Sequence, residues 1–271
     1  MTTTQPVALV TGASSGIGQA AALGLVEAGF AVVGTSRNTS GISQREGVTF
    51  LDLDVASDES VATVVQRVID QFGRLDVLVN NAGIGSAGAA EERSVVQDQS
   101  VFDINVFGLI RMTKAVLPHM RARGGGRIIN ISSVLGFAPA PYMAAYAATK
   151  HAVEGYSESL DHEVREHGVR VLLVQPAYTR TGFDANIMQP DTPLPIYAQR
   201  RQVFDQVMAN AIQGGDDPAT VARVIVAAAT DPKPKLRYTA GSTAGRVSAL
   251  RRIVPARAFD KQIRKLNRLA G

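Results

Sequence analysis

Residues 7–18 read VALVTGASSGIG, and this stretch decides the fold. Its first four residues are apolar, as expected of a strand that is buried on both faces of a parallel sheet. The glycines that follow, spaced G-x-x-x-G-x-G, let the backbone approach a pyrophosphate, whose charge would lie at the start of the next helix. A glycine turn between a strand and a helix can also serve tight packing alone, so the turn by itself leaves both interpretations open.

The chain beyond this turn alternates strand-like and helix-like segments. Ser57 is a good N-cap, Gly73 a good helix end, and Asp217 followed by Pro218 opens another helix. Such alternation predicts right-handed crossovers and a single-domain, doubly wound (Rossmann-type) α/β fold over residues 1–271. The predicted strands are Val7–Thr11, Ala31–Thr35, Val48–Leu53, Val77–Asn80, Arg127–Ser132, Arg170–Gln175 and Leu236–Thr239.

Composition excludes several classes of protein. The 271 residues are 45% hydrophobic and 19% charged, which fits one large domain. Without cysteine the chain has no disulfide, thiolate metal site or catalytic thiol. Its four histidines lack metal-ligand spacing, so we expect no metal. The first residues show no signal peptide and the run Val224–Ala229 is too short to span a bilayer, so we expect a cytoplasmic protein.

Two segments depart from the regular pattern. Residues 182–215 carry Pro190, Pro193 and Pro195 and no clear strand, and they follow the sixth strand at the edge where ligands bind in such folds. We expect them to form a substrate lid with a hinge at Gly214–Gly215. The extension 242–271 is basic, with eight arginines and lysines against one acid between residues 246 and 268. A solvated helix face explains it better than contact with a membrane surface or nucleic acid.

The end of the second strand indicates which dinucleotide would bind. An acid at this point holds the adenosine ribose in enzymes that prefer NAD. Here Ser36, Arg37 and Asn38 end the strand, and no acid follows until Glu46. The Arg37 guanidinium suits a 2′-phosphate, which favours NADP(H), although Arg37 could also be an ordinary surface arginine.

A tyrosine and a lysine offer acid/base chemistry. Tyr146 and Lys150 lie four residues apart in a segment with helical periodicity that reaches about Glu166, so they share a helix face. A nearby cation can lower the pKa of a phenol from ~10 by about one to three units. This spacing alone is weak evidence, because any exposed helix can show it.

Other polar residues are expected at the same edge of the sheet. Ser132 and Ser133 follow the fifth strand, the sequence Asn-Asn-Ala-Gly at residues 80–83 ends the fourth, and Asn105 lies in a helix between them. The carboxyl ends of parallel strands meet in one crevice, so these groups should converge with Tyr146.

In this order the motifs resemble those of the short-chain dehydrogenase/reductase family, from Val7 to about Gly241, and the tail looks like its hydroxysteroid and retinol dehydrogenase branch. The resemblance implies a seven-stranded parallel sheet. It makes Tyr146 the general acid/base, and Lys150 the residue that lowers the pKa of Tyr146 and holds the nicotinamide ribose. Ser133, which has the family's spacing from Tyr146, would bind the reacting oxygen, and Asn105 would hold a water that relays protons. Ser132 is then structural.

The resemblance also implies the cofactor contacts. Asp54 and Val55 match the pair that contacts adenine, and Thr181 is expected near the nicotinamide carboxamide. The expected set is Gly12, Ser14, Ser15, Gly16, Ile17, Gly18, Ser36, Arg37, Asn38, Asp54, Val55, Asn81, Ala82, Gly83, Tyr146, Lys150, Pro176, Ala177, Thr179 and Thr181.

The chain departs from the family at the end of the sixth strand. Residues 176–181 read PAYTRT, where the family has Pro-Gly and then a threonine. Ala177 replaces the glycine and Thr179 replaces an aliphatic residue. The turn also lacks the basic residue that some NADP-preferring members carry beside Gly16, so the NADP prediction depends mainly on Arg37.

These observations predict an NADP(H)-dependent carbonyl reductase, or the reverse alcohol dehydrogenase, with a hydrophobic substrate. The family implies a homodimer or homotetramer formed through the helices of Asn105 and Tyr146. The alternative is an NADP-binding regulator or scaffold without turnover. Expected pocket residues, each of which could instead be plain core, are Val134, Leu135, Phe137, Tyr142, Met143, Phe183, Ile187 and Met188.

Overall fold

The computed structural model describes residues 4–42, 47–183 and 187–269. Within them the chain forms a seven-stranded sheet whose strands all run parallel, in the order β3-β2-β1-β4-β5-β6-β7. The winding direction therefore reverses between β1 and β4, which confirms the predicted doubly wound α/β fold. The strands are β1 (Val7–Val10), β2 (Ala31–Ser36), β3 (Val48–Asp52), β4 (Val77–Asn80), β5 (Gly126–Ile131), β6 (Val169–Pro176) and β7 (Arg237–Ala240).

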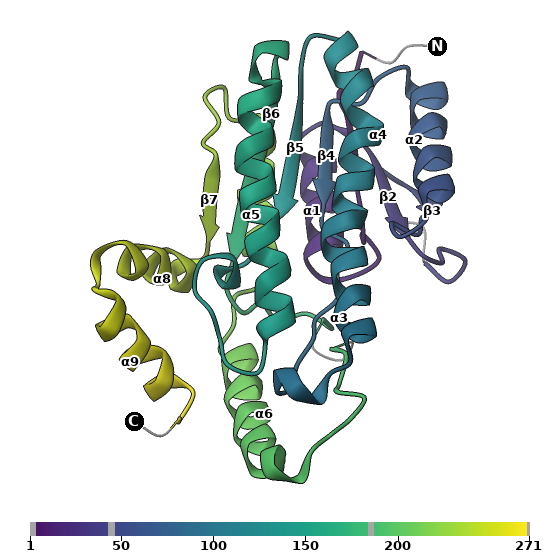
Figure 1. The fold of residues 1–271 in the computed structure, drawn as a ribbon. Coiled ribbons are helices and arrows are strands. Elements are labelled where there is room, and N and C mark those ends of the chain that lie inside the picture. The colour runs from purple at the N-terminus through teal and green to yellow at the C-terminus, as the bar shows by residue number, and fades with distance from the viewer. Residues whose placement is uncertain (1–3, 43–46, 184–186, 270–271) are drawn as a thin grey trace.

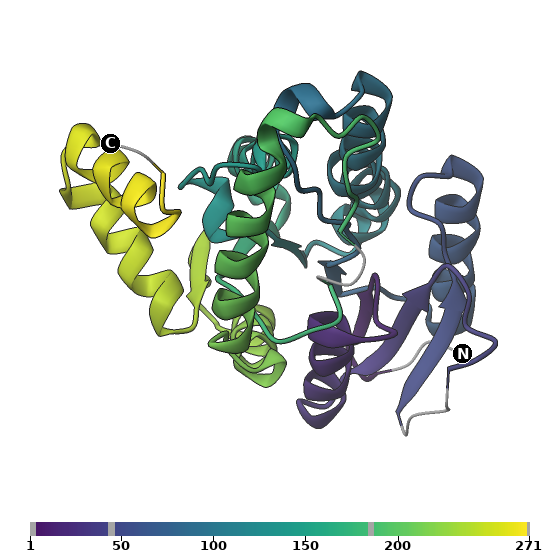
Figure 2. The same cartoon turned by 90° about the horizontal axis from the view of Figure 1, so that it is seen from below.

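Helices cover both faces of the sheet. In Figure 1, α2, α4 and α5 lie in front of the strands and α1 lies behind them. Helix α6 lies beyond the carboxyl ends of the strands, and Figure 2 shows α8 and α9 at the side of the molecule far from β2 and β3. The helices are α1 (Gly16–Glu27), α2 (Asp58–Phe72), α3 (Val95–Phe102), α4 (Leu109–Ala122), α5 (Ala144–Val164), α6 (Ala198–Gln213), α7 (Pro218–Thr230), α8 (Ser242–Ile253) and α9 (Ala256–Leu266).

Each strand end lies within one residue of its predicted position. The reason is visible in the core, because the central strands are buried on both faces. Leu9 and Leu78 face the helices α2, α4 and α5, while Val10 and Val79 face α1 and α7. Full burial of such a side chain stabilises the fold by about 1.5–3 kcal/mol, so apolar runs and strands coincide.

The predicted helix ends are also confirmed. The Ser57 hydroxyl accepts a hydrogen bond from the Ser60 amide (3.2 Å), and Gly73 ends α2 in the left-handed conformation, with φ 70°. The Asp217 carboxylate accepts from the Ala219 amide (2.8 Å), with Pro218 in the first turn of α7. These local bonds satisfy the backbone groups that a helix end leaves unpaired.

Asp161 attaches the far end of α5 to the sheet. Its buried carboxylate accepts hydrogen bonds from the Arg170 Nε (2.9 Å) and the Val171 amide (2.9 Å) of β6, and also pairs with Arg165. Burial opposes ionisation, but these donors outweigh it and lower the pKa of Asp161. The helix that carries Tyr146 is thereby held against β6.

The segment predicted as a lid consists of a proline-rich stretch and a helix. Pro195 begins a short 3-10 turn (Pro195–Tyr197) that runs into α6, and residues 184–186 of the predicted lid lie outside the described residues. At Gly215, a Cβ atom would lie 2.8 Å from the Tyr178 carbonyl oxygen, so close packing explains this glycine. The hinge and the division into lid and extension stay predictions.

Helices that cross a bilayer need about 20 consecutive, mostly apolar residues. None of the helices in residues 4–42, 47–183 and 187–269 is both long and apolar enough to cross a membrane.

Candidate active site

The glycine turn between β1 and α1 lies where the strand order reverses. Gly12 and Gly16 have φ of 66° and 56°, in the left-handed region that favours glycine. A Cβ atom at Gly18 would lie 2.2 Å from the Gly12 carbonyl oxygen and 2.4 Å from the Asn81 Nδ2. The turn is thus folded tightly against the first turn of α1, and the space in front of its backbone stays free of side chains from these positions.

Asn81 holds the turn in this shape. Its Nδ2 donates hydrogen bonds to the carbonyl oxygens of Thr11 and Gly12 (3.0 Å each), and the Thr11 hydroxyl accepts from the amides of Asn81 and Ala82 (3.0 Å each). Gly83 is close to the Asn105 Oδ1, which a Cβ atom would approach to 3.1 Å. The Asn-Asn-Ala-Gly segment therefore supports the turn, and its predicted contact with adenosine is untested.

The end of β2 carries an exposed cation. Arg37 is exposed and makes no hydrogen bond or ion pair within the described part of the chain, whereas the Asn38 Oδ1 accepts from Ser40 (2.9 and 2.7 Å). Glu46, the nearest acid in sequence, lies outside the described residues.

An acid that sequence reasoning missed lies beside β2 in space. Asp52 ends β3 and pairs with Ser36 in the sheet register. Its Oδ1 accepts from the hydroxyl (2.7 Å) and amide (2.8 Å) of Thr39, and these bonds lower the pKa of Asp52. Only the pairing of β2 with β3 brings this carboxylate close, so spacing along the chain could not reveal it.

The predicted adenine pair follows β3. The Asp54 carboxylate accepts from the Ala56 amide (2.9 Å), and its own amide donates to the Ser60 hydroxyl (3.0 Å). Val55 is buried, and a Cβ atom at Gly108 would lie 2.8 Å from its Cγ2. Both residues thus fix the loop after β3 onto neighbouring helices.

Tyr146, Lys150 and Ser133 come together, as predicted. The Lys150 Nζ lies 5.6 Å from the centre of the Tyr146 ring and donates to the Ile131 carbonyl (2.8 Å) at the end of β5. Ser133 caps the short turn after β5 by accepting from the Leu135 amide (3.1 Å), and its hydroxyl interacts with the Tyr146 phenol. The Ser132 hydroxyl is buried, faces Gly136 and has no hydrogen-bond partner among the described residues.

The pKa of Tyr146 differs from the prediction. Burial raises it above the ordinary value, the hydrogen bond with Ser133 lowers it, and the nearby Tyr178 raises it further. Lys150 is not among the groups that set this pKa in the protein as described, so its lowering effect stays a prediction. The lysine's ammonium group is directed to the Ile131 carbonyl, and burial lowers its own pKa to about 8, against a raising effect of Glu154.

Asn105 lies in a π-helical turn (Asp103–Gly108) between α3 and α4 rather than in regular α-helix. Its Nδ2 donates to the Ile84 carbonyl (2.9 Å) and the Thr149 hydroxyl (3.3 Å), and its Oδ1 accepts from the Ile84 amide (2.8 Å). The carboxamide therefore ties the segment after β4 to α5. Its part in a proton relay is untested, and the bonds seen here involve no group that transfers protons.

The segment after β6 reaches back to the glycine turn. Pro176 ends β6, and a Cβ atom at Gly16 would lie 3.1 Å from the Thr181 side chain, so Thr181 stands against the turn as expected of a cofactor neighbour. The Thr179 hydroxyl is directed back to the Ala177 carbonyl (3.2 Å). Their predicted cofactor contacts are untested.

An apolar cluster lies beside Tyr146. It contains the predicted pocket residues Leu135, Tyr142, Met143 and Ile187. The Phe183 ring also lies near that of Tyr146, with centres 6.0 Å apart. The members that sequence reasoning missed come from α6 and from loops: Ala87, Tyr178, Phe204, Met208 and Ile212.

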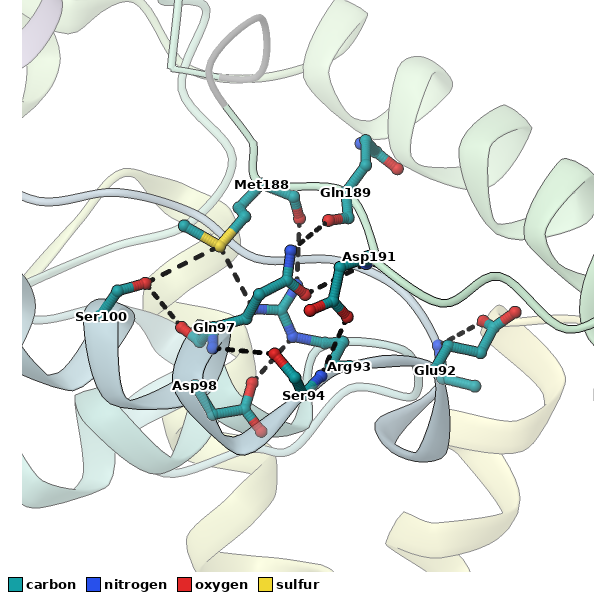
Figure 3. Close-up of polar contacts among 10 residues, drawn as sticks. Glu92, Arg93, Ser94, Gln97, Asp98, Ser100, Met188, Gln189 and Asp191 are labelled. Atoms are coloured by element: carbon teal, nitrogen blue, oxygen red, sulfur yellow. Dashed lines mark hydrogen bonds and ion pairs between the residues drawn. The ribbon is translucent and has the colours of Figure 1, made fainter.

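Met188 does not line this pocket. Its sulfur contacts Arg93 (3.6 Å) and the Ser100 hydroxyl (3.9 Å), and its carbonyl accepts from Arg93 (3.2 Å). Figure 3 shows the chain around residues 188–191 fastened to the start of α3, where the Gln97 side chain bonds the backbone of Gln189 and Asp191. The prediction was wrong because this polar network directs Met188 to α3.

Glu92 holds the part of the chain that follows residues 188–191. Its carboxylate is fully buried and accepts from the amides of Ala89 (3.0 Å) and Leu194 (2.8 Å) while it pairs with Arg201 of α6. Helix α6 in turn places Phe204 in the apolar cluster. Glu92 thus determines where one wall of the pocket lies, from about a hundred residues away in sequence.

The basic extension packs on the turn that follows Ser133. Arg251 of α8 donates to the Phe137 carbonyl (3.0 Å), and its guanidinium lies 5.0 Å from the centre of the Phe259 ring of α9. Most of its other basic residues are exposed, as a solvated face requires, but so are Leu250 and Ile253.

The chain is similar in sequence to known dehydrogenases and reductases. The family model described as short chain dehydrogenase matches residues 6–192. The chain is 46% identical to a 3-ketodihydrosphingosine reductase of Bacteroides thetaiotaomicron, over 66% of each chain, so about a third of that reductase lies outside the match. It is 34% identical to retinol dehydrogenase 8 of Bos taurus, over 92% of this chain and 85% of that one.

Solved structures of similar proteins have the same fold, and they include one with NADP and one with NAD. A short-chain dehydrogenase from Streptomyces avermitilis superimposes with a TM-score of 0.82 at 36% identity over 98% of both chains. ElxO with NADP bound has a TM-score of 0.74 at 26% identity, over 89% of this chain and 99% of its own. A Burkholderia phymatum enzyme in complex with NAD has a TM-score of 0.78 at 27% identity, over 96% of this chain and 95% of its own.

Replacing Glu92 should destabilise the protein far more than replacing its neighbour. Glu92→Ala removes the acceptor of two buried amides and leaves Arg201 unpaired, which should cost about 3–5 kcal/mol in the free energy of unfolding. Glu91→Ala, which removes an exposed carboxylate bonded to the Tyr197 hydroxyl, should cost less than about 1 kcal/mol. Urea denaturation of both variants measures the difference. Equal losses of unfolding free energy in the two variants would contradict the role of Glu92 in holding α6 and the segment before it.

Proposed function

The chain belongs to the short-chain dehydrogenase family of oxidoreductases, and from this premise we propose that it transfers hydride between NADP(H) and a hydrophobic ketone, aldehyde or secondary alcohol. One observation carries the proposal, namely that Tyr146 and Lys150 of α5 meet Ser133 of the β5 edge beside an apolar cluster. A binding protein without turnover has no need of this acid/base arrangement, so the regulator or scaffold interpretation is disfavoured.

The glycine turn fits a dinucleotide. Cβ atoms at Gly12, Gly16 and Gly18 would lie 3.1 Å from Ala82, 3.1 Å from Thr181 and 2.2 Å from the Gly12 carbonyl oxygen, and would distort the turn. Helix α1 begins there, so its free amides would face a bound pyrophosphate. Asp54 and Val55 would lie near the adenine, and Thr181 near the nicotinamide. When bound, the reduced nicotinamide supplies the hydride.

The chain's own residues supply the proton and the orientation. Tyr146 donates its phenol proton to the carbonyl oxygen in the reducing direction, and accepts it back from the alcohol in the oxidising direction. Ser133 binds the same oxygen and holds it near Tyr146. Lys150 supports the phenol through its charge and orients the cofactor ribose. We also propose that Asn105 holds a water that relays protons, as the sequence predicts.

Arg37 supports NADP(H) as the cofactor. Its guanidinium is exposed at the end of β2 and unpaired within the described residues, whereas Asp52, the acid beside it, is engaged by Thr39. A free guanidinium suits a 2′-phosphate, and an occupied carboxylate competes less for a ribose hydroxyl. Similar structures bind NADP in one case and NAD in another, so the argument depends on Arg37.

The pocket and the similar proteins support a lipid-like substrate. The cluster beside Tyr146 is made of aliphatic, methionine and aromatic side chains. The similar proteins include, by name, a 3-ketodihydrosphingosine reductase and a retinol dehydrogenase.

We further propose that the protein works in the cytoplasm, without nucleic acid, as a homodimer or homotetramer. The exposed Phe107, in the π-helical turn next to α4, is consistent with such pairing.

The proposal is tested first with Tyr146→Phe. We expect wild type to oxidise NADPH in the presence of hydrophobic ketones, and the variant to lose about 10²–10⁴-fold in kcat because the general acid is removed. NADPH absorbance measures turnover, and a titration followed by the fluorescence of NADPH measures its binding, which should stay unchanged. Full turnover by the variant would refute the mechanism, and tight NADPH binding by a wild type that turns over no ketone would favour the regulator.

Arg37→Asp tests the choice of cofactor. Loss of a charge-assisted contact with the 2′-phosphate, and its replacement by a repulsive charge, should weaken NADPH binding roughly ten- to a hundredfold, while NADH binding improves. Arg252→Asp, which makes the same change at an exposed site on α8, is the matched control. An unchanged preference for NADPH in Arg37→Asp would exclude the role given to Arg37.

Glu154→Gln tests the electrostatics around Lys150. The pKa of Lys150 is about 8, so its charge is present below that pH and is lost as the pH rises through it. Glu154 raises this pKa, and Arg237 of β7 shares the Glu154 carboxylate. Removing the negative charge should move the alkaline decline of kcat to lower pH. Glu158→Gln, which also removes a partner of Arg237 but is exposed, should leave the decline in place. Identical profiles for both variants would contradict this role of Lys150.

A further inference from the structure

The basic extension exposes apolar side chains among its arginines and lysines. Helices α8 and α9 lie next to each other at the side of the molecule beyond β7 (Figures 1 and 2). On α8, Leu250 is 53% exposed and Ile253 is 80% exposed. Arg246, Leu250 and Ile253 follow the spacing i, i+4, i+7, so these exposed residues share one face of the helix. A face that served solvation alone would be polar at all of these positions, so the expected solvated face does not account for α8.

Helix α9 has the same combination of residues. Its basic residues Arg257, Lys261 and Lys265 recur every four positions, so they follow one side of the helix, and all three are exposed. Phe259 lies on another side and is buried. Leu266, which is spaced to share the side of Phe259, is 67% exposed. Helix α9 is therefore a basic amphipathic helix whose apolar side is only partly covered by the rest of the protein.

The charge of the extension is of one sign and mostly unpaired. Eight arginines and lysines stand against one acid between residues 246 and 268, whereas the whole chain carries only +4, so the rest of the molecule is net negative. Arg246, Arg257, Lys261 and Lys265 form no hydrogen bond or ion pair with the described residues. An anionic surface would therefore attract this end of the molecule and repel the remainder, which fixes how the protein approaches it.

Two hydrogen bonds attach the extension to elements that contribute to the apolar cluster. Arg251 of α8 donates to the Phe137 carbonyl (3.0 Å) in the turn after β5, and Arg200 of α6 donates to the Arg268 carbonyl (3.0 Å) beyond α9. Another exposed aliphatic residue, Ile196, is 79% exposed and stands four positions before Arg200. The exposed apolar side chains thus lie on, or next to, elements that border the pocket proposed for a lipid-like substrate.

We propose that α8, α9 and the turn before α6 bind the surface of a bilayer that contains anionic phospholipid. The arginines and lysines meet the phosphate headgroups, and Leu250, Ile253 and Leu266 enter the boundary between headgroups and acyl chains. The protein binds peripherally, through short helices that lie on the membrane. This inference goes beyond the proposed function, because such binding requires neither cofactor nor turnover.

An anionic bilayer fits this surface better than the other possible occupants. A second copy of the chain would bring the same positive charge against it, which opposes association. Nucleic acid would neutralise the charge but would leave the aliphatic side chains without an apolar partner, and none of the exposed apolar residues of α8 and α9 is an aromatic on which a base could stack. A bilayer with anionic headgroups supplies both the negative charge and the apolar interior.

Vesicle flotation tests the proposal with the full chain. The protein is mixed with vesicles of phosphatidylcholine alone, or of phosphatidylcholine and phosphatidylglycerol in a two-to-one ratio, and the bound fraction is measured. We expect roughly tenfold or greater preference for the anionic vesicles, and weaker binding at higher salt concentration because salt screens the charges. Equal binding to both kinds of vesicle, or binding to neither, would overturn the proposal.

Single variants identify the surface. Ile253→Ser should weaken binding to the anionic vesicles roughly tenfold, because less apolar area enters the membrane, and Arg257→Ser should weaken it roughly fivefold. Val95→Ser of α3 and Arg67→Ser of α2 make matched changes at exposed sites away from the extension and should leave binding unchanged. Thermal unfolding shows that each variant is folded. The same loss of binding in the matched controls would exclude the assigned surface.

The other occupants give different results. If two copies associated through this surface, sedimentation velocity would show a smaller assembly for Ile253→Ser than for wild type. If nucleic acid were the partner, a DNA duplex would bind more tightly than the anionic vesicles. Either result would overturn the proposal. Neither concerns the turnover of ketones, so failure of membrane binding leaves the oxidoreductase proposal intact, and loss of the oxidoreductase proposal leaves membrane binding in place.

Discussion

The hydrogen bond from the Lys150 Nζ to the Ile131 carbonyl joins the helix that carries Tyr146 to the strand that leads to Ser133. Apolar contacts between α5 and β5 alone would tolerate sliding, and this bond adds a fixed direction at the end of the helix that carries Tyr146. The same helix is held at its other end by Asp161, which bonds Arg170 and Val171 of β6. Two directional contacts at the two ends of α5 fix both its position along the sheet and its rotation, and Tyr146 is therefore held beside Ser133.

The interior of the molecule repeats this use of polar contacts between layers. Asn80 of β4 donates to Asn130 of β5 (2.9 Å), and Asn130 donates to Ser157 of α5 (2.8 Å). Glu154 accepts from Gln175 of β6 (2.9 Å) and pairs with Arg237 of β7. Apolar packing supplies most of the stability of such a core, but it specifies register poorly. Buried amides and carboxylates, which are unfavourable when unpaired, make the alternative registers costly.

The sequence was sufficient for the sheet and for the pairing of Tyr146 with Lys150, because both depend on short-range patterns. Apolar runs mark strands that are buried on both faces, and Tyr146 and Lys150 lie one helical turn apart. What could not be predicted depends on contacts between distant segments. Asp52 lies beside Ser36 only through pairing of β2 with β3, and Glu92 places the pocket wall through Arg201. Met188 was misplaced for the same reason, since its position is decided by Arg93, far from it in sequence.

The electrostatics of the site favour the neutral form of Tyr146. The sequence indicated a lowered pKa for Tyr146 because a lysine stands one turn away, but proximity is only one of the effects that set a pKa. Burial raises the pKa of the phenol and lowers that of the ammonium, because each group loses solvation in its charged form. At neutral pH the phenol is then protonated, which is the form that donates a proton to a carbonyl oxygen. The neutral phenol suits the proton donation that we propose for the reducing direction, and the same group accepts the proton back in the oxidising direction.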